Sequence, residues 1–261
     1  MHPHHSQSIQ NVTEYFQRDP EVQALLLAGS IAHGFQSTTS DVDIMIFVSE
    51  ESYQERFRTG RIHFFNTDLC TYEGGYVDGK YLSLHFVRQV LERGSEPARF
   101  AFEGSRVLFS RVPGFEEDVC RIAIFPRAEK DEHIRRFYAQ FEAWRWYCGE
   151  ALKQGNQYLL RTSVSKLILF GGRLILAHNE MLYPYHKWFL KVLERASDKP
   201  TGLMTCIEEL TQSPTANNIE IFYENIKTFR TWSDQPQSWP AQFMLDSELN
   251  WLNGRTPVED I

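Results

Sequence analysis

The sequence predicts an α+β fold in which a small mixed β-sheet is followed by an all-α region. Short apolar runs, bounded by glycine, asparagine and serine, alternate with helical segments up to residue 126. Beyond it the apolar positions recur with the 3.6-residue spacing of helices, and all six tryptophans lie there. We therefore expect two domains, residues 1–126 and 127–261, with Pro126 at their boundary.

Helices and strands are expected to alternate in the first domain. An amphipathic helix over residues 8–19 ends before Pro20, and a buried strand over residues 24–28 follows. The histidines that precede this helix are expected in a mobile terminus. The further elements expected are strands over residues 41–48, 62–65, 69–72, 76–82 and 106–109, and helices over residues 50–58 and 84–93.

The second domain is expected to consist of helices and to bind substrate. Gly171 and Gly172 interrupt one of these helices, at a cost of about 1 kcal/mol each relative to alanine. Such a pair indicates close helix packing or room for a ligand, and packing is the interpretation we favour. The helices expected begin near residue 129 and then cover residues 159–179, 187–195, 203–210, 218–232 and 242–252.

The net charge of −7 is unevenly distributed. Residues 1–126 hold 11 Lys+Arg and 17 Asp+Glu, a balance of −6, whereas the balance over residues 127–261 is −1. No basic stripe is present in the sequence, which argues against a long nucleic acid as partner. The charge favours a small-molecule partner instead.

Cysteine usage and hydropathy favour a cytoplasmic protein. The four cysteines are scattered without a Cys-x-x-Cys pair, as is typical of reduced thiols. The sequence opens without the apolar segment of a signal peptide. The most apolar helical run, residues 167–176, is too short to cross a bilayer. We therefore expect no membrane partner, and the sequence leaves the oligomeric state open.

The motif that indicates chemistry lies between residues 24 and 48. Gly29-Ser30 follows the first buried strand as a tight turn, which offers backbone N–H groups and a hydroxyl to a phosphate. Asp41 and Asp43 begin the next strand, and two residues that are two apart leave a strand on the same face. Neighbouring carboxylates repel each other unless cations bind between them, and hard divalent cations are the natural partners. The combination predicts phosphoryl chemistry.

This arrangement resembles the signature of the polymerase-β-like nucleotidyltransferase superfamily. The spacing from Gly29 to Asp41 is similar to that of the members that modify aminoglycoside or lincosamide antibiotics. Residues 94–100, 170–179 and 183–188 resemble a group of bacterial nucleotidyltransferase-domain proteins. The resemblance implies a nucleotidyltransferase domain followed by a helical domain, and transfer of a nucleoside monophosphate from a nucleoside triphosphate.

A third carboxylate usually completes such a site, as a metal ligand or as the base that takes the acceptor proton. Asp78 is the first candidate, because Lys80 shares its strand face and supplies a cation for triphosphate. Asp68 is the second candidate. Glu129 and Glu132, near the domain boundary, are weaker candidates for the base.

The predicted function is therefore an Mg²⁺-dependent nucleotidyltransferase that modifies a hydroxyl of a small molecule, with antibiotics among the candidate acceptors, and releases pyrophosphate. Asp41, Asp43 and Asp78 are the expected ligands of two Mg²⁺ ions, and Gly29 and Ser30, with Lys80, the expected ligands of ATP or another triphosphate. An alternative is a non-catalytic nucleotide-binding or antitoxin-like module of the same fold. The signatures of P-loop NTPases and of dinucleotide-binding folds are absent from the sequence.

Overall fold

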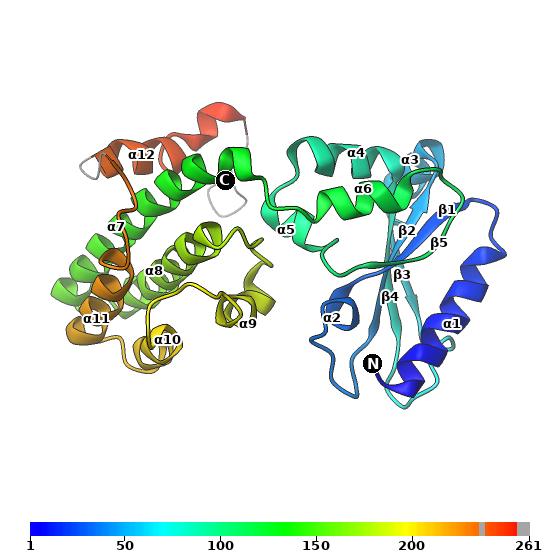
Figure 1. Ribbon diagram of the computed structural model, residues 1–261, viewed down its shortest axis with the longest axis horizontal. Coiled ribbons are helices and arrows are strands. Elements are labelled where there is room, and N and C mark those ends of the chain that lie inside the picture. The colour runs from blue at the N-terminus through cyan, green and yellow to red at the C-terminus, as the bar shows by residue number, and fades with distance from the viewer. Residues whose placement is uncertain (235–237, 255–261) are drawn as a thin grey trace. The chain divides into compact units, whose positions relative to one another are not determined.

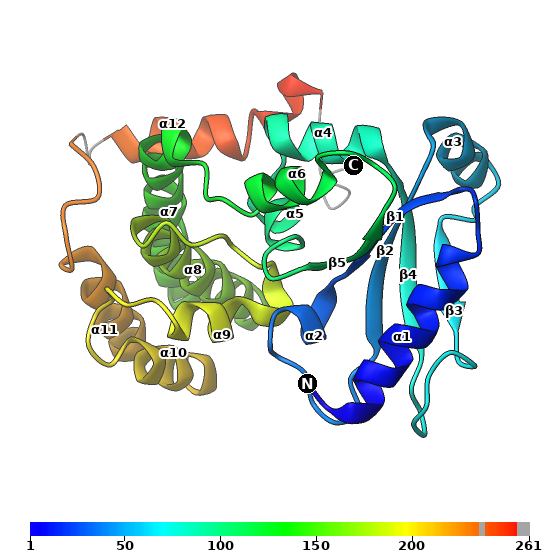
Figure 2. The same cartoon turned by 45° about the vertical axis from the view of Figure 1, so that its right-hand side comes forward.

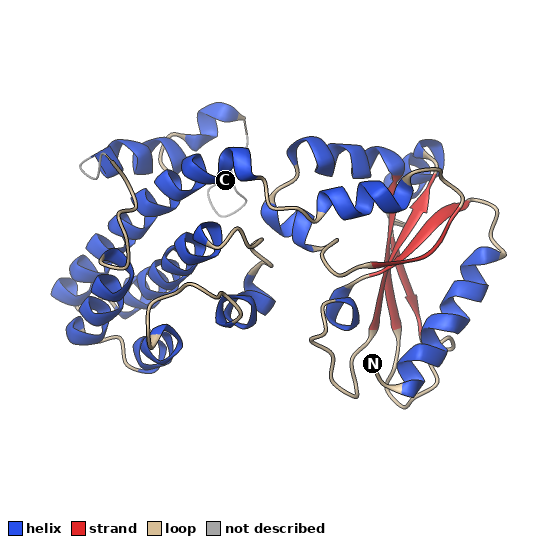
Figure 3. Cartoon of the chain, in the orientation of Figure 1, coloured by secondary structure: helices blue, strands red, loops and turns tan. Residues whose placement is uncertain are grey.

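The computed structural model describes residues 1–234 and 238–254 (Figure 1). The chain divides into two compact units, Met1–Phe125 and Pro126–Ile261. A five-stranded sheet with helices on both faces forms the first unit, and every regular element described in the second unit is a helix (Figure 3). The predicted α+β fold class is therefore confirmed.

The sheet of the first unit has the strand order β3-β4-β2-β1-β5. β2 and β4 run parallel, whereas the β1–β2, β1–β5 and β3–β4 pairs are antiparallel. The elements are α1 (Pro3–Gln17), β1 (Val22–Leu27), α2 (Gly29–Ala32), β2 (Val42–Val48), α3 (Glu50–Arg58), β3 (His63–Asn66), β4 (Val77–Ser83), α4 (Leu84–Arg93), α5 (Glu96–Phe100), β5 (Arg106–Ser110) and α6 (Phe115–Ile122).

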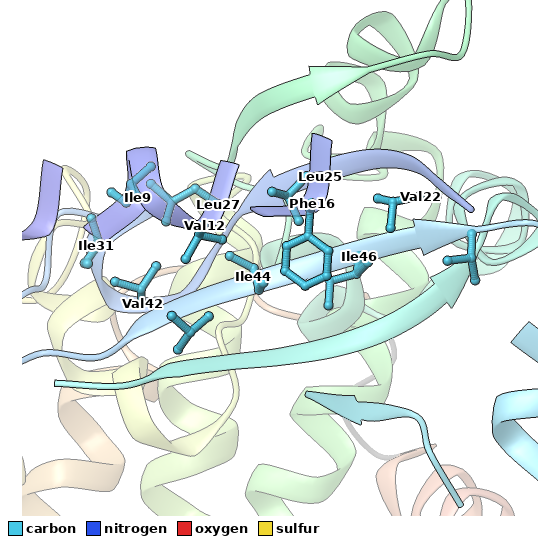
Figure 4. Close-up of a cluster of buried hydrophobic side chains, with 12 residues drawn as sticks. Ile9, Val12, Phe16, Val22, Leu25, Leu27, Ile31, Val42, Ile44 and Ile46 are labelled. Carbon is cyan, nitrogen blue, oxygen red and sulfur yellow. The ribbon is translucent and has the colours of Figure 1, made fainter. Parts of the chain in front are cut away.

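Two hydrophobic layers enclose this sheet. Figure 4 shows the layer beneath α1, where Phe16 packs among strand residues such as Leu25 and Ile46. On the opposite face Met45 and Phe47 belong to a second layer, which the helices α4 and α6 complete (Figure 2). Alternate residues of β2 thus face opposite layers, as a strand buried on both faces requires.

The same alternation decides where the candidate acids lie. Val42 and Ile44 point into the layer beneath α1, and Met45 points into the layer beneath α4 and α6. Asp43 shares the face of Met45, but it lies at the beginning of β2, where the strand is half-buried and not fully covered. The sheet therefore presents Asp43 at one end of the α4–α6 face.

The first helix begins earlier than the sequence analysis predicted. α1 starts at Pro3, five residues before the expected start, so the expectation of a mobile terminus is wrong. Proline suits the first turn of a helix because it has no N–H group to leave unsatisfied. The rings of His4 and His5 lie 4.6 and 5.2 Å from the ring of Tyr72, and His5 is fully buried. These contacts hold the start of α1 against the rest of the unit.

The expected strand over residues 69–72 is wrong. Its backbone groups bond to side chains of α1 instead of to a neighbouring strand. Asn11 donates to the carbonyl oxygen of Leu69 at 3.1 Å, and the N–H of Thr71 donates to the hydroxyl of Ser8 at 3.1 Å. Because side chains of α1 satisfy these backbone N–H and C=O groups, the segment does not need to pair with a strand.

The second unit is built around the long helix pair α7 and α8. No helix within residues 1–234 and 238–254 is both long and apolar enough to span a membrane. The elements are the 3-10 helix η1 (Arg127–Glu129), α7 (Lys130–Gln154), α8 (Gln157–His178), the 3-10 helix η2 (His186–Trp188), α9 (Phe189–Glu194), α10 (Leu203–Gln212), α11 (Ala216–Lys227), α12 (Trp239–Asp246) and the 3-10 helix η4 (Asn250–Asn253).

The helix expected over residues 218–232 both begins and ends earlier, as α11. Thr215 caps its start, because its hydroxyl accepts the N–H of Asn218 at 3.2 Å. After the helix, the buried indole of Trp232 turns back and donates to the carbonyl oxygen of Ile226 at 2.8 Å. This bond satisfies one of the last carbonyls of the helix.

The helix expected over residues 242–252 is divided into α12 and η4. α12 begins at Trp239, with a proline in its first turn, and ends at Asp246. Ser247 leaves the helical conformation, and its hydroxyl accepts the side-chain amide of Gln140 at 2.8 Å. The bond to α7 therefore accompanies the break in the predicted helix.

Gly171 and Gly172 allow close helix packing, as predicted. A Cβ added to Gly171 would lie 2.9 Å from the Phe222 ring, and one added to Gly172 would overlap the Phe189 ring. Both glycines are buried. Aromatic side chains therefore fill the space that the missing side chains leave.

Candidate active site

The turn after β1 depends on glycine at position 29 for two independent reasons. Gly29 has a φ of +63°, in the left-handed region that side chains disfavour. A Cβ at this position would also overlap the carboxylate of Asp43. The preceding N–H, of Ala28, donates to the carbonyl oxygen of Asp43 at 2.9 Å and extends the β1–β2 ladder. The turn and the first acid of β2 are therefore fixed against each other.

Ser30 follows as the second residue of the short helix α2. It is buried, and its hydroxyl has no hydrogen-bond partner within the described part of the chain. The first N–H groups of a helix also lack partners inside that helix. An unsatisfied buried hydroxyl costs about 1–3 kcal/mol, so a bound group that accepts or donates a hydrogen bond here would recover that free energy.

Asp43 and Asp78 lie opposite each other on neighbouring strands. β2 and β4 pair in parallel with Asp43 in register with Asp78, and cross-strand partners share one face of the sheet. Both residues are half-buried. The structure thus brings the first candidate for the third carboxylate directly beside the Asp-x-Asp motif.

Asp41 lies one residue before β2, and its carboxylate interacts with the phenol of Tyr76. The pKa of Tyr76 is raised chiefly by the negative charge of Asp41, with partial burial and a hydrogen bond to Asp41 adding to it. The charges of Asp43 and Asp78 contribute in the same direction. All three predicted carboxylates are therefore close enough to act on one phenol.

The loop that leads into Asp41 is held from two sides. The phenol of Tyr72 donates to the carbonyl oxygen of Ser40, and Nε2 of His4 lies 2.9 Å from the carbonyl oxygen of Thr38. Ser40 also closes the loop through its own hydroxyl, which accepts the N–H of Ser37 at 2.9 Å. These bonds position Asp41 without using its carboxylate.

β3 adds a residue that sequence reasoning missed. Nε2 of His63 lies 3.1 Å from Oδ1 of Asp78, and His63 pairs in register with Lys80. His63, Asp78 and Lys80 therefore share one face of the β3–β4 pair, where Lys80 is exposed. The only signal in the sequence is the alternation of side chains along the strand expected over residues 62–65, which places His63 on the same face as Phe65.

The other candidates for the third carboxylate are not on β2 or β4. Asp68 is exposed in the turn after β3, where its carboxylate accepts a hydrogen bond from the hydroxyl of Thr67 at 3.5 Å. Glu129 belongs to the second unit, where it lies 3.4 Å from His133. Glu132, also in the second unit, lies 3.9 Å from a guanidinium nitrogen of Arg136. Asp78 is thus the candidate that the first sheet places opposite Asp43.

The residues present fit a magnesium site that a substrate completes. Among residues 1–234 and 238–254, no three or more His, Cys, Asp or Glu side chains are grouped so as to hold a metal ion by themselves. Mg²⁺ in phosphoryl-transfer sites is usually held by one or two carboxylates together with substrate phosphates. Asp43 and Asp78 supply such carboxylates, and the hydroxyl of Ser30, without a partner among the described residues, supplies a donor for a phosphate.

Comparison with known proteins supports a nucleotidyltransferase fold. Residues 10–68 match the family described as "Polymerase beta, Nucleotidyltransferase". The matched segment contains Gly29, Ser30, Asp41 and Asp43 and ends before Asp78. No curated protein matches the chain.

Solved structures extend the likeness to the whole chain. One of them is the crystal structure, at 1.90 Å resolution, of a nucleotidyltransferase-like protein from Exiguobacterium sibiricum 255-15. It shares 11% sequence identity with this chain and has a TM-score of 0.50, and the match covers 97% of this chain and 82% of that one. At this identity the likeness is one of fold. The two findings together support the superfamily, and the link to antibiotic-modifying enzymes rests on motif spacing alone.

Proposed function

We propose that this protein transfers a nucleoside monophosphate from a nucleoside triphosphate, with ATP the first candidate, to a hydroxyl of a small molecule and releases pyrophosphate. The observation that carries the proposal is the contact between the Gly29 turn and the carboxylate of Asp43. It joins a potential phosphate-binding turn and a potential metal-binding acid at one point. The match of residues 10–68 to a nucleotidyltransferase family supports the class of reaction.

In this proposal the turn binds the phosphates that leave. The hydroxyl of Ser30 and the N–H groups at the start of α2 donate to the β- and γ-phosphates. The ammonium group of Lys80, exposed on the same sheet face as Asp78, offsets further negative charge of the triphosphate. Binding the leaving group firmly holds the α-phosphorus in one orientation for attack.

The carboxylates hold magnesium and receive the acceptor proton. Asp41 and Asp43, with Asp78, would hold two Mg²⁺ ions. When bound, Mg²⁺ neutralises phosphate charge and lowers the pKa of the acceptor hydroxyl. Asp78 takes the proton of that hydroxyl, and the contact at 3.1 Å from His63 orients the carboxylate of Asp78.

A small acceptor agrees with the charge of the chain. Residues 1–126 carry a balance of −6, which repels a long nucleic-acid backbone. Residues 127–261 contribute to substrate binding in this proposal, and an antibiotic is one of the acceptors to be tested.

A nucleotide-binding module without transfer is the second candidate. One observation favours it: Asp78, the proposed base, already lies in contact with His63. An acid engaged in this way could bind nucleotide with its neighbours and leave the acceptor proton in place. Such a module would bind ATP without releasing pyrophosphate in the presence of any acceptor.

The experiment incubates the protein with Mg²⁺, ATP labelled at the α-phosphate and a small-molecule cell extract. We expect pyrophosphate release and a product whose mass has risen by one nucleotidyl group, that is, by a nucleoside monophosphate less one water. Asp43→Asn should lower the rate about a thousandfold, because a ligand of the activating cation is lost. Circular dichroism and thermal melting should show an unchanged fold.

The matched control is Asp68→Asn, which removes an exposed carboxylate from the same unit. It should retain the wild-type rate. Wild-type activity in the Asp43 variant would contradict the proposal. Binding of ATP without any pyrophosphate release, over all acceptors in the extract, would favour the non-catalytic module.

A further inference from the structure

An aromatic pair, one ring exposed and the other half-buried, lies on the sheet face of Asp78. Phe65 on β3 is in register with Asp78 on β4, so the two side chains share one face of the sheet. The ring of Tyr76 lies 5.3 Å from the ring of Phe65, with 32° between the ring planes. We call Phe65 and Tyr76 the aromatic ledge. It is built from residues of the first unit alone.

The ledge is not part of the hydrophobic core. Phe64, the preceding residue of β3, packs against Phe16 of α1 with ring centroids 5.0 Å apart. Phe65 points to the opposite face and is 58% exposed. A large apolar ring left in water beside carboxylates gains nothing for folding, since exposed apolar surface is stabilising only when something covers it.

The strand order places the ledge on one side of the acids and the phosphate turn on the other. Across the sheet the sequence of features is the Gly29-Ser30 turn after β1, Asp43 on β2, Asp78 on β4 and Phe65 on β3. Neighbouring strands lie about 4.8 Å apart, so the ledge begins about 10 Å from the strand of Asp43. The ledge thus lies on the strand next to that of Asp78, on the side away from the turn.

Phosphoryl transfer adds a directional constraint. The attacking and leaving oxygens lie roughly in line on opposite sides of the phosphorus. If pyrophosphate leaves toward the turn after β1, the acceptor must approach from the side of β4 and β3. The ledge is the surface that the structure offers on that side.

We propose that the aromatic ledge is the acceptor subsite and that the acceptor is an alcohol carrying a ring whose flat face stacks on Phe65. This inference rests on the proposed function. The acceptor oxygen forms a bond to the α-phosphorus while the bond from that phosphorus to the bridging oxygen of pyrophosphate breaks. The hydroxyl proton passes to the carboxylate of Asp78. Stacking of the ring fixes the hydroxyl next to that carboxylate.

The test uses the full-length protein with Mg²⁺ and α,β-methylene-ATP, and measures binding of small alcohols by saturation-transfer NMR. The ring-bearing probes are 2-phenylethanol and phenyl β-D-glucoside, and the open-chain probes are glycerol and sorbitol. Phe65→Ala should weaken binding of the ring-bearing probes about tenfold, and Phe65→Tyr should restore it. Open-chain probes should not distinguish the variants.

Phe57→Ala is the matched control, because Phe57 is 61% exposed on α3 and follows the opposite end of β2. It should bind every probe as the wild type does. The proposal is overturned if the wild type binds no ring-bearing probe at millimolar concentration, or if Phe65→Ala binds them as tightly as Phe57→Ala.

The same variants separate this inference from the proposed function. With an acceptor identified from the extract, Phe65→Ala should raise the KM for the acceptor about tenfold and leave the KM for ATP unchanged. A raised KM for ATP instead would assign the ledge to the nucleotide and overturn the proposal. Phe65-dependent binding of rings without pyrophosphate release would keep the ledge and remove the transfer. If Phe65→Ala and Phe57→Ala both transfer the nucleotide with the same KM for the acceptor, the proposed function stands and the ledge is not the acceptor subsite.

Discussion

The turn after β1 and the middle of α8 both require glycine, for opposite reasons. At Gly29 an added Cβ would overlap a carboxylate, that of Asp43, and the backbone has a φ of +63°. At Gly172 the added Cβ would overlap the aromatic ring of Phe189, and the backbone is helical. One glycine admits a charged group, and the other admits apolar packing. What the missing side chain makes room for therefore distinguishes a site from a core.

Buried hydroxyls support the same distinction. Ser30 and Ser163 are both buried, and neither hydroxyl has a hydrogen-bond partner in the described part of the chain. Ser163 lies within α8, which contributes the buried residues Leu167 and Val164 around it to the helical core. Ser30 instead follows a turn that abuts Asp43. Burial without a partner indicates a site only where a charged group is adjacent.

Among the glycine variants, the largest effect is expected from Gly29→Ala. The new methyl group must displace the Asp43 carboxylate, and a misplacement of about 1 Å at a reacting centre lowers rates about a hundredfold. Left-handed backbone adds about 1–2 kcal/mol of destabilisation. Pyrophosphate release and urea unfolding measure the two effects.

Gly34→Ala is the control for the destabilisation that comes from the left-handed backbone alone. Gly34 has a φ of +72°, and a Cβ there meets nothing within 4 Å in the part of the chain that the structure describes. It should lose comparable stability and keep its activity. Equal activity in the two alanine variants would show that the contact with Asp43 has no catalytic meaning.

Gly172→Ala should affect stability alone. Overpacking against the Phe189 ring costs about 1–3 kcal/mol, and the gain in helix propensity offsets about 1 kcal/mol of it. Gly171→Ala, whose Cβ would lie 2.9 Å from the Phe222 ring, should cost less. Denaturant unfolding and the rate of pyrophosphate release check this. A loss of activity without a loss of stability would remove the contrast with Gly29.

The smallest effect concerns the core of the helical unit at high pH. Burial, then the hydrogen bond and the charge of Glu142, raises the pKa of Tyr223 above its ordinary value. The unfolded chain therefore releases the phenolic proton at lower pH than the folded chain does. This contribution to stability is full below about pH 10 and is lost as the pH rises further.

Tyr223→Phe removes that dependence. Its free energy of unfolding should fall less steeply than that of the wild type between about pH 10 and pH 11, and it should be about 1 kcal/mol lower at pH 7. Tyr158→Phe, at a position 82% exposed, should follow the wild type. Identical slopes for all three proteins would show that the Tyr223–Glu142 pair does not contribute to stability.

The sequence predicted those parts of the fold that local pattern controls. After Asp43, β2 is a continuous run of apolar residues, and the apolar residues of α8 recur with helical spacing, so each element could be predicted from its own residues. Residues 69–72 were misread, because their partner is α1, more than 50 residues away in the sequence. The short helices α5 and α6 were missed because neither is long enough to show a period.

For the site, local sequence predicted which residues matter but not how the strands align them. Asp78 was chosen for its apolar neighbours and for Lys80, and the parallel register then placed it opposite Asp43. The contact of His63 with Asp78 and the ledge at Phe65 depend on the antiparallel register of β3, which no local pattern specifies.

The most direct test of the central claim is a calorimetric titration of α,β-methylene-ATP into the protein with and without Mg²⁺. If the turn at Gly29 and the acid at Asp43 form one magnesium–triphosphate site, the wild type and Asp68→Asn should bind tightly only with Mg²⁺. Asp43→Asn should bind at least about tenfold more weakly and lose the dependence on Mg²⁺. Equal, Mg²⁺-dependent binding by the wild type and Asp43→Asn would contradict the account.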